Sequence, residues 1–155
     1  MYRIRFHGRG GQGIKTAGRI LGSAFFNEGL EVQDAPVYGA ERRGAPMFAY
    51  VRAARTPIQE RGAITHPDLV IVADESLVSV PAAGVLQGVT GRSVLLINSA
   101  ESPATWKERL RLTGSIVTLP VSAEVTRRSE LPYVGAMCAG AAARLTGAIG
   151  RAALE

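Results

Sequence analysis

The chain has 155 residues, 46% hydrophobic and 20% charged, a balance typical of one globular domain with a single core rather than of a disordered segment. No apolar run approaches the roughly 20 residues that cross a bilayer, and the N-terminus lacks the apolar stretch of a signal peptide, so a cytoplasmic protein without membrane contact is expected. A single cysteine, Cys138, excludes an internal disulfide, an all-cysteine zinc site and an iron–sulfur cluster held by this chain.

The formal net charge of +5 permits one class of function, a basic nucleic-acid-binding module. The arginines are spread along the chain, however, and aromatic residues make up only 6% of it. A surface that stacks on bases needs aromatic side chains interleaved with basic ones. An acidic partner subunit or a phosphorylated ligand is therefore the preferred explanation of the charge, and nucleic acid is not an expected partner.

The first predicted elements are a strand over residues 2–7, where apolar and polar side chains alternate, and a helix over about 14–28, where apolar residues recur at helical spacing. Gly29 follows as a helix-ending residue. Further strands are predicted at about 30–35 and 47–52. No crossover helix fits between these two strands, so they are expected to be antiparallel or loosely connected neighbours.

The second half of the chain alternates strands with helices. Continuous apolar runs at 68–73 and 93–98 are typical of strands buried on both faces. A helix is predicted over about 76–87, which Pro81 could interrupt. The remaining predicted elements are a short helix over 103–112, a strand over 115–120 and a helix over 133–149. The alternation predicts a three-layer α/β/α, Rossmann-like domain over residues 1–155, with a largely parallel, mixed sheet.

A glycine loop, residues 8–13 with the sequence GRGGQG, lies between the first predicted strand and helix. Gly8, Gly10 and Gly13 match the spacing G-x-G-x-x-G. The first N–H groups of a helix have no partner within the helix, and the helix dipole adds partial positive charge there. Because glycine lets an anion approach the bare backbone, the loop predicts a phosphate or pyrophosphate site. The alternative is a tight turn that binds nothing.

One residue supports a dinucleotide as the ligand of this loop. Asp34 lies about 20 residues beyond Gly13, near the end of the second predicted strand, where such domains place the acidic residue that binds the ribose. A free-standing NAD(P)-binding oxidoreductase is therefore an alternative. Against it, no helix follows the second strand, and the later half of the chain offers no acid–base pair. No catalytic residue and no set of metal ligands is predicted in this chain.

A second segment of interest, the arginine segment, covers residues 38–46 and reads YGAERRGAP. It follows a predicted strand, at the edge of the sheet where α/β proteins bind ligands. Arg42 and Arg43 could each hold a phosphate or carboxylate with two donors. The alternative is an exposed ion pair on a surface loop, which would contribute little.

The motifs GRGGQG and GAERRGAP, separated by about 25 residues, together resemble the gamma subunit of 2-oxoacid:ferredoxin oxidoreductases, most closely the pyruvate type. The similarity continues through Phe6-His7, the start of the first helix, and 67–72, and it covers about residues 3–150. Many family members continue beyond the position of Glu155, so a C-terminal packing element is expected to be absent.

The resemblance implies a subunit of an enzyme that decarboxylates a 2-oxoacid oxidatively and passes electrons to ferredoxin or another acceptor. Thiamine diphosphate and iron–sulfur clusters are then expected on partner subunits, namely alpha, beta and a ferredoxin-like delta subunit, and the isolated chain should be inactive. Coenzyme A is the cofactor expected on this chain. The backbone of Gly10, Gly11, Gln12 and Gly13, in the fingerprint that Gly8 begins, would face its phosphates. Arg42 and Arg43 would supply charge or hold their loop at the subunit junction.

Overall fold

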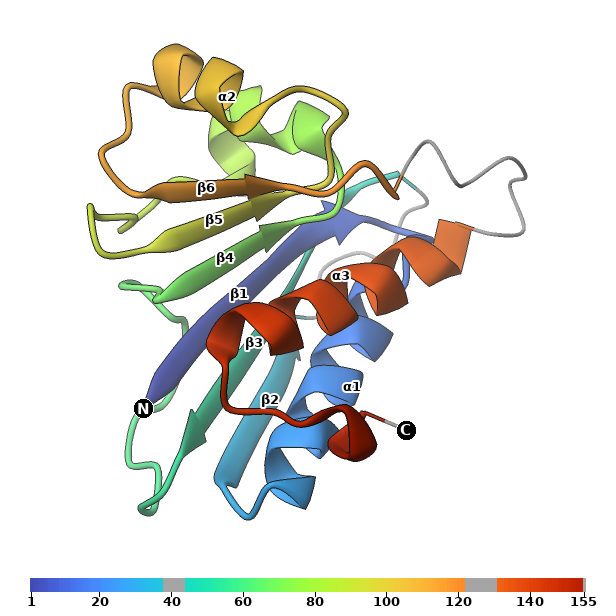
Figure 1. Cartoon of the computed structure of the whole chain (residues 1–155), viewed down its shortest axis with the longest axis vertical. Helices are drawn as coiled ribbons and strands as arrows, with labels where there is room; N and C mark the ends of the chain where they lie inside the picture. Colours follow the sequence, from blue (N-terminus) through green and yellow to red (C-terminus); the bar gives the residue numbers. More distant parts are fainter. Residues whose placement is uncertain (38–43, 122–130, 155) are drawn as a thin grey trace.

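The computed structural model describes residues 1–37, 44–121 and 131–154, which form one six-stranded sheet with helices packed on it (Figure 1). The strands are β1 (Tyr2–Arg9), β2 (Glu31–Val37), β3 (Pro46–Ala54), β4 (Leu69–Val72), β5 (Val94–Ile97) and β6 (Ser115–Thr118). The helices are α1 (Ile14–Asn27), α2 (Pro103–Leu110) and α3 (Leu131–Thr146). Within the described residues, no helix is long and apolar enough to cross a membrane.

The strand order in the sheet is β2-β3-β1-β4-β5-β6. β1, β4, β5 and β6 run parallel, whereas β3 is antiparallel to both of its neighbours, β1 and β2. This confirms the predicted mixed, largely parallel sheet and the antiparallel pairing of the second and third strands. An antiparallel pair of strands can be joined by a loop alone, so the short connection between β2 and β3 needs no crossover helix.

Two apolar clusters lie on opposite faces of the sheet, because successive residues of a strand point to opposite sides. Ile4 and Phe6 of β1 pack in one cluster with α1 and α3. Val70 and Val72 of β4 pack in the other, where α2 contributes Trp106. With the sheet between α1 and α3 on one side and α2 on the other, the three-layer α/β prediction is confirmed.

The helix predicted over 76–87 is wrong. The structure instead has two short 3₁₀ turns, Glu75–Ser79 and Pro81–Ala83, separated by Val80 with φ −96° and ψ 106°. The ring of Pro81 disfavours a helical conformation at the preceding residue and removes a backbone donor, so the chain becomes extended there. The Asp74 carboxylate caps the first turn by accepting from the Ser76 N–H, with Oδ1 and N 3.0 Å apart.

Candidate functional site

The glycine loop lies between β1 and α1, at the carboxyl edge of the parallel strands, as predicted (Figure 1). Gly13, the residue before α1, adopts a left-handed conformation with φ 72°, and Gly11 has φ 98°. Residues with a Cβ rarely adopt these angles, so both positions favour glycine. Within the part of the chain that the structure describes, no side chain accepts a hydrogen bond as a cap at Gly13, the residue before α1.

Hydrogen bonds within the protein occupy some of the backbone N–H groups of the predicted phosphate site. The Gly10 N–H donates to the Ala45 carbonyl, with N and O 2.9 Å apart, and the Gln12 N–H donates to the Arg9 carbonyl at 3.1 Å. The Gln12 side chain accepts from the Arg9 N–H, with Oε1 2.7 Å from N. Two of the four N–H groups expected to face phosphates are thus occupied. Those of Gly11 and Gly13 have no hydrogen-bond partner among the described residues.

Gly8 is packed closely against the start of α1. It is buried, and a Cβ at this position would overlap the side chain of Ile14 at the start of α1. A side chain at this position would displace Ile14, so the close approach of the loop to the first turn of the helix favours glycine.

The N-terminal part of α3 packs directly on the glycine loop. The Gly135 N–H donates to the Gln12 carbonyl, with N and O 3.0 Å apart. A Cβ at Gly135 would lie 2.7 Å from the carbonyl oxygens of both Gln12 and Gly13. A glycine at this position permits the close approach, but nothing in the sequence identifies a loop as the packing partner of this helix.

The end of the arginine segment contacts the same loop. The Gly44 N–H donates to the Gly10 carbonyl, with N and O 3.3 Å apart, next to the bond from the Gly10 N–H to Ala45. Arg42 and Arg43, which the sequence predicts as anion ligands, lie outside the described residues. The structure therefore brings the described end of one motif to the other motif.

Arg9 is a residue of the site whose role the sequence did not reveal. Its Nε lies 3.0 Å from Asp74 Oδ2, one Nη lies 2.9 Å from the Gly44 carbonyl oxygen, and the other lies 2.8 Å from Ser76 Oγ. One guanidinium thus connects the glycine loop, the end of the arginine segment and the turn after β4. The only sequence signal was its place within GRGGQG, because its partners are distant in the chain.

The geometry does not support the dinucleotide alternative. β3 lies between β1 and β2, so a whole strand separates Asp34 from the glycine loop. Asp34 lies instead against the middle of α1, with its Cβ 3.6 Å from where a Cβ on Gly22 would be. A ribose bound by Asp34 would be too far from a pyrophosphate at the start of α1. No group of three potential metal ligands occurs within the residues that the structure describes.

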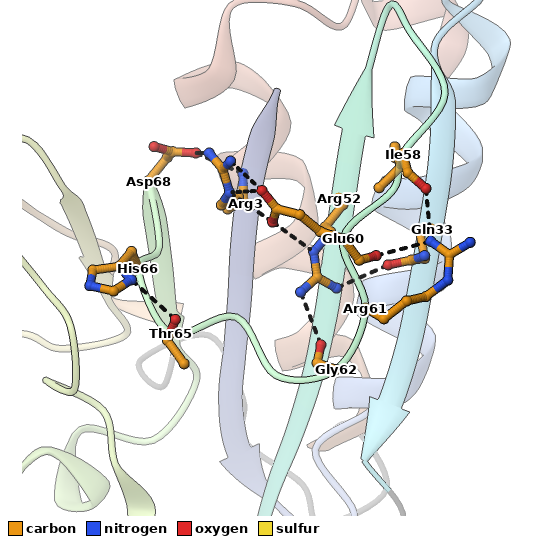
Figure 2. Close-up of polar contacts among 10 residues, drawn as sticks. All are labelled: Arg3, Gln33, Arg52, Ile58, Glu60, Arg61, Gly62, Thr65, His66 and Asp68. Atoms are coloured by element: carbon orange, nitrogen blue, oxygen red, sulfur yellow. Dashed lines mark hydrogen bonds and ion pairs between the residues drawn. The ribbon is translucent and has the colours of Figure 1, made fainter.

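A separate polar cluster lies at the amino edge of the sheet, where Arg3 of β1 and Arg52 of β3 both approach Glu60 (Figure 2). Arg3 Nε lies 3.0 Å from Glu60 Oε2, and Arg52 Nε lies 3.5 Å from the same oxygen. The hydrogen bond from Arg3 lowers the pKa of the Glu60 carboxyl. These contacts hold the loop after β3 across the sheet, at the edge opposite to the glycine loop.

The chain is similar to proteins of one enzyme family over nearly its whole length. The family model described as "Pyruvate ferredoxin/flavodoxin oxidoreductase" matches residues 3–155. The common gamma subunit of pyruvate/ketoisovalerate oxidoreductases from Thermococcus kodakarensis is 37% identical over 150 residues, which cover 96% of this chain and 80% of the relative. Pyruvate synthase subunit PorC from Methanothermobacter marburgensis is 37% identical over 149 residues, with the same coverage.

Solved structures agree with this similarity. The crystal structure of pyruvate oxidoreductase subunit PORC from Thermotoga maritima matches with a TM-score of 0.79 and 33% identity, covering 99% of this chain and 80% of the other. A 2-oxoglutarate:ferredoxin oxidoreductase from Magnetococcus marinus, solved with 2-oxoglutarate, coenzyme A and succinyl-CoA, matches with a TM-score of 0.73 and 20% identity. That match covers 99% of this chain and 25% of the larger protein, and it shows a common fold.

Proposed function

Because the chain belongs to the pyruvate ferredoxin/flavodoxin oxidoreductase family, we propose that it is the gamma subunit of a multi-subunit, pyruvate-type 2-oxoacid oxidoreductase. In this role, residues 1–155 form one domain that works in the cytoplasm with alpha, beta and ferredoxin-like delta subunits. The observation that carries the proposal is the hydrogen-bonded contact between the glycine loop and the end of the arginine segment, in a chain 37% identical to a gamma subunit.

In this proposal the chain contributes a binding surface and no redox centre. Cys138, its one cysteine, is fully buried, and burial raises the pKa of the thiol to about 12, which does not fit an iron–sulfur ligand. We therefore assign the clusters and thiamine diphosphate to partner subunits, and electrons leave to ferredoxin or another acceptor through the complex. Thiamine diphosphate, when bound there, would supply the carbanion stabilisation that decarboxylation needs.

Coenzyme A is the cofactor that we assign to this chain, at the glycine loop and the described end of the arginine segment, residues 44–46, which contacts it. The N–H groups of Gly11 and Gly13, which have no partner within the described residues, are two donors for a phosphate at the start of α1. Gly10 and Gln12 would keep the loop in shape through their bonds to Ala45 and Arg9. Arg42 and Arg43 would add positive charge or hold the segment against a partner subunit.

The test of the subunit role is recovery of a complex. Affinity purification of the tagged chain from its native host should recover subunits that contain thiamine diphosphate and iron–sulfur clusters, detectable by cofactor analysis and absorbance. The isolated chain should not reduce ferredoxin with any 2-oxoacid, whereas the recovered complex should. A chain that purifies alone, or that binds DNA or RNA with a steep salt dependence, would contradict the proposal.

The coenzyme A assignment has its own test by calorimetry. Arg42→Ala and Arg43→Ala are each expected to weaken coenzyme A binding by about 1–3 kcal/mol, because each removes a charged donor from a phosphate. Arg92→Ala, at an exposed arginine between β4 and β5, is the matched control and should bind as the wild type does. Wild-type affinity in both variants would remove these arginines from the site, and tight NAD or NADP binding without coenzyme A binding would favour the dehydrogenase alternative.

A further inference from the structure

One face of β1 carries a row of basic side chains. Because residues alternate along a strand, those that point away from α1 and α3 are Arg3, Arg5, His7 and Arg9. The two arginines at the ends of the row have carboxylate partners: Arg3 pairs with Glu60, and Arg9 pairs with Asp74. Arg5, in the middle, has no carboxylate partner within the described residues.

Arg5 is nevertheless almost completely buried, with 4% of its surface exposed. Among the described residues its guanidinium donates only to backbone carbonyls, with one Nη 3.1 Å from Ile64 O and the other 2.9 Å from Val85 O. Its Nε has no hydrogen-bond partner in this part of the chain. Carbonyl oxygens supply dipoles but no net negative charge, and burial of a charge without a counter-charge is costly.

A cavity of about 220 Å³ lies beside this guanidinium, between the sheet and the loops at 63–65 and 82–87. His7 also lines it and is 3% exposed. Neither ring nitrogen makes a hydrogen bond of good geometry within the described residues, although the Ala83 backbone lies near enough to the ring to raise its pKa in part. The ring stands edge-on to Phe48, with their centroids 5.2 Å apart. Buried polar atoms normally have partners, so these nitrogens and Arg5 Nε together indicate a ligand.

We propose that this cavity, the Arg5 cavity, binds a short-chain monocarboxylate whose carboxyl group accepts hydrogen bonds from Arg5 Nε and the His7 ring. One unpaired guanidinium balances one negative charge. Burial, with the neighbouring Arg5, lowers the pKa of His7 to about 4, so the ring is neutral near pH 7 and adds a donor without a second charge. The Phe48 ring and Ala83 provide apolar wall for a short aliphatic group, which an inorganic oxyanion would not use.

The chain itself contains the probe for this site, since His7 and His66 are its two histidines. Imidazole NMR of the full chain at pH 7 follows His7 as the site and exposed His66 as an internal reference. Titration with acetate, at constant ionic strength set by chloride, is expected to shift the His7 signals in a saturable way, with a Kd on the order of 1–10 mM. Phosphate should not saturate these signals.

Two variants test the location without disturbing the core. Gln87 lines the cavity and is exposed, so Gln87→Glu places a carboxylate beside Arg5 and is expected to weaken acetate binding about tenfold. Gln59→Glu is the same change at an exposed position that does not line the cavity, and it should leave acetate binding unchanged.

Three results would overturn the proposal: His7 signals that do not respond to acetate up to about 100 mM, saturation by phosphate but not by acetate, or equal acetate binding in Gln87→Glu and the wild type. Saturation by acetate that Gln87→Glu weakens and Gln59→Glu does not would support it. The test does not depend on coenzyme A or on partner subunits, so its failure leaves the proposed function unaffected.

Discussion

Gly135→Ala is expected to lower the free energy of unfolding by about 2–4 kcal/mol, because the added methyl group has no room. Its Cβ would lie 2.7 Å from the carbonyl oxygens of Gln12 and Gly13, and backbone atoms cannot move aside as the end of a flexible side chain can. To relieve the overlap, α3 must move away from the glycine loop, which would also break the hydrogen bond from the Gly135 N–H to Gln12.

The same helix contains a matched control. Gly140 also lies in α3, but a Cβ there would have no neighbour within 4 Å. Gly140→Ala should therefore stabilise the protein by up to about 1 kcal/mol, since alanine favours the helix more than glycine does. Urea unfolding of both variants gives the comparison. Equal stability of the two would show that α3 does not depend on its approach to the loop.

Acid is expected to destabilise the protein through His7 by about 3 kcal/mol between pH 7 and pH 4. Burial, reinforced by the Arg5 guanidinium, lowers the pKa of His7 from 6.5 to about 4, and the nearby Ala83 backbone offsets this only in part. In the unfolded chain the ring takes up a proton near its ordinary pKa, whereas the folded protein resists it down to about pH 4. The stabilisation is thus complete above pH 6.5 and is lost as the pH falls toward 4.

The measurement is the free energy of unfolding in urea at several pH values, in buffers without carboxylates. His7→Gln should lack this part of the pH dependence, so its curve should approach that of the wild type as the pH falls. His66→Gln, at an exposed histidine, is the control and should follow the wild type. Carboxylates such as Glu60, whose pKa is lowered by Arg3, contribute equally to the pH dependence of unfolding in all three proteins. Parallel curves for His7→Gln and the wild type would contradict the prediction.

Periodicity predicted most of the elements because the apolar pattern reports which side of a segment is buried. The alternation in β1 and the helical spacing in α1 both correspond to real faces of these elements. The prediction failed between Glu75 and Ala83, where Asp74-Glu75-Ser76 could cap a helix. Val80 before Pro81 is extended instead. The steric conflict between the Pro81 ring and the preceding residue outweighed the capping signal.

The candidate site could be predicted only where its parts are close in sequence. The glycine loop and the arginine segment were recognisable as motifs, whereas Arg9's bonds to Asp74 and Gly44 join segments far apart in the chain. Arg5 and His7 of β1 alternate with apolar residues, but the sequence did not show that both would be buried. The loops at 63–65 and 82–87 that lie over them are distant in the chain.

The pairing of Gly10 with Gly44 and Ala45 has a consequence for insertions and deletions. It fixes where β3 begins, and β3 then continues in register with β1 as far as Ala53 opposite Tyr2. A slip of one residue would turn Arg52 toward the apolar cluster beneath α1. A difference in chain length between the two motifs is therefore expected to fall before Gly44. An insertion or deletion within β3 would shift its register with β1.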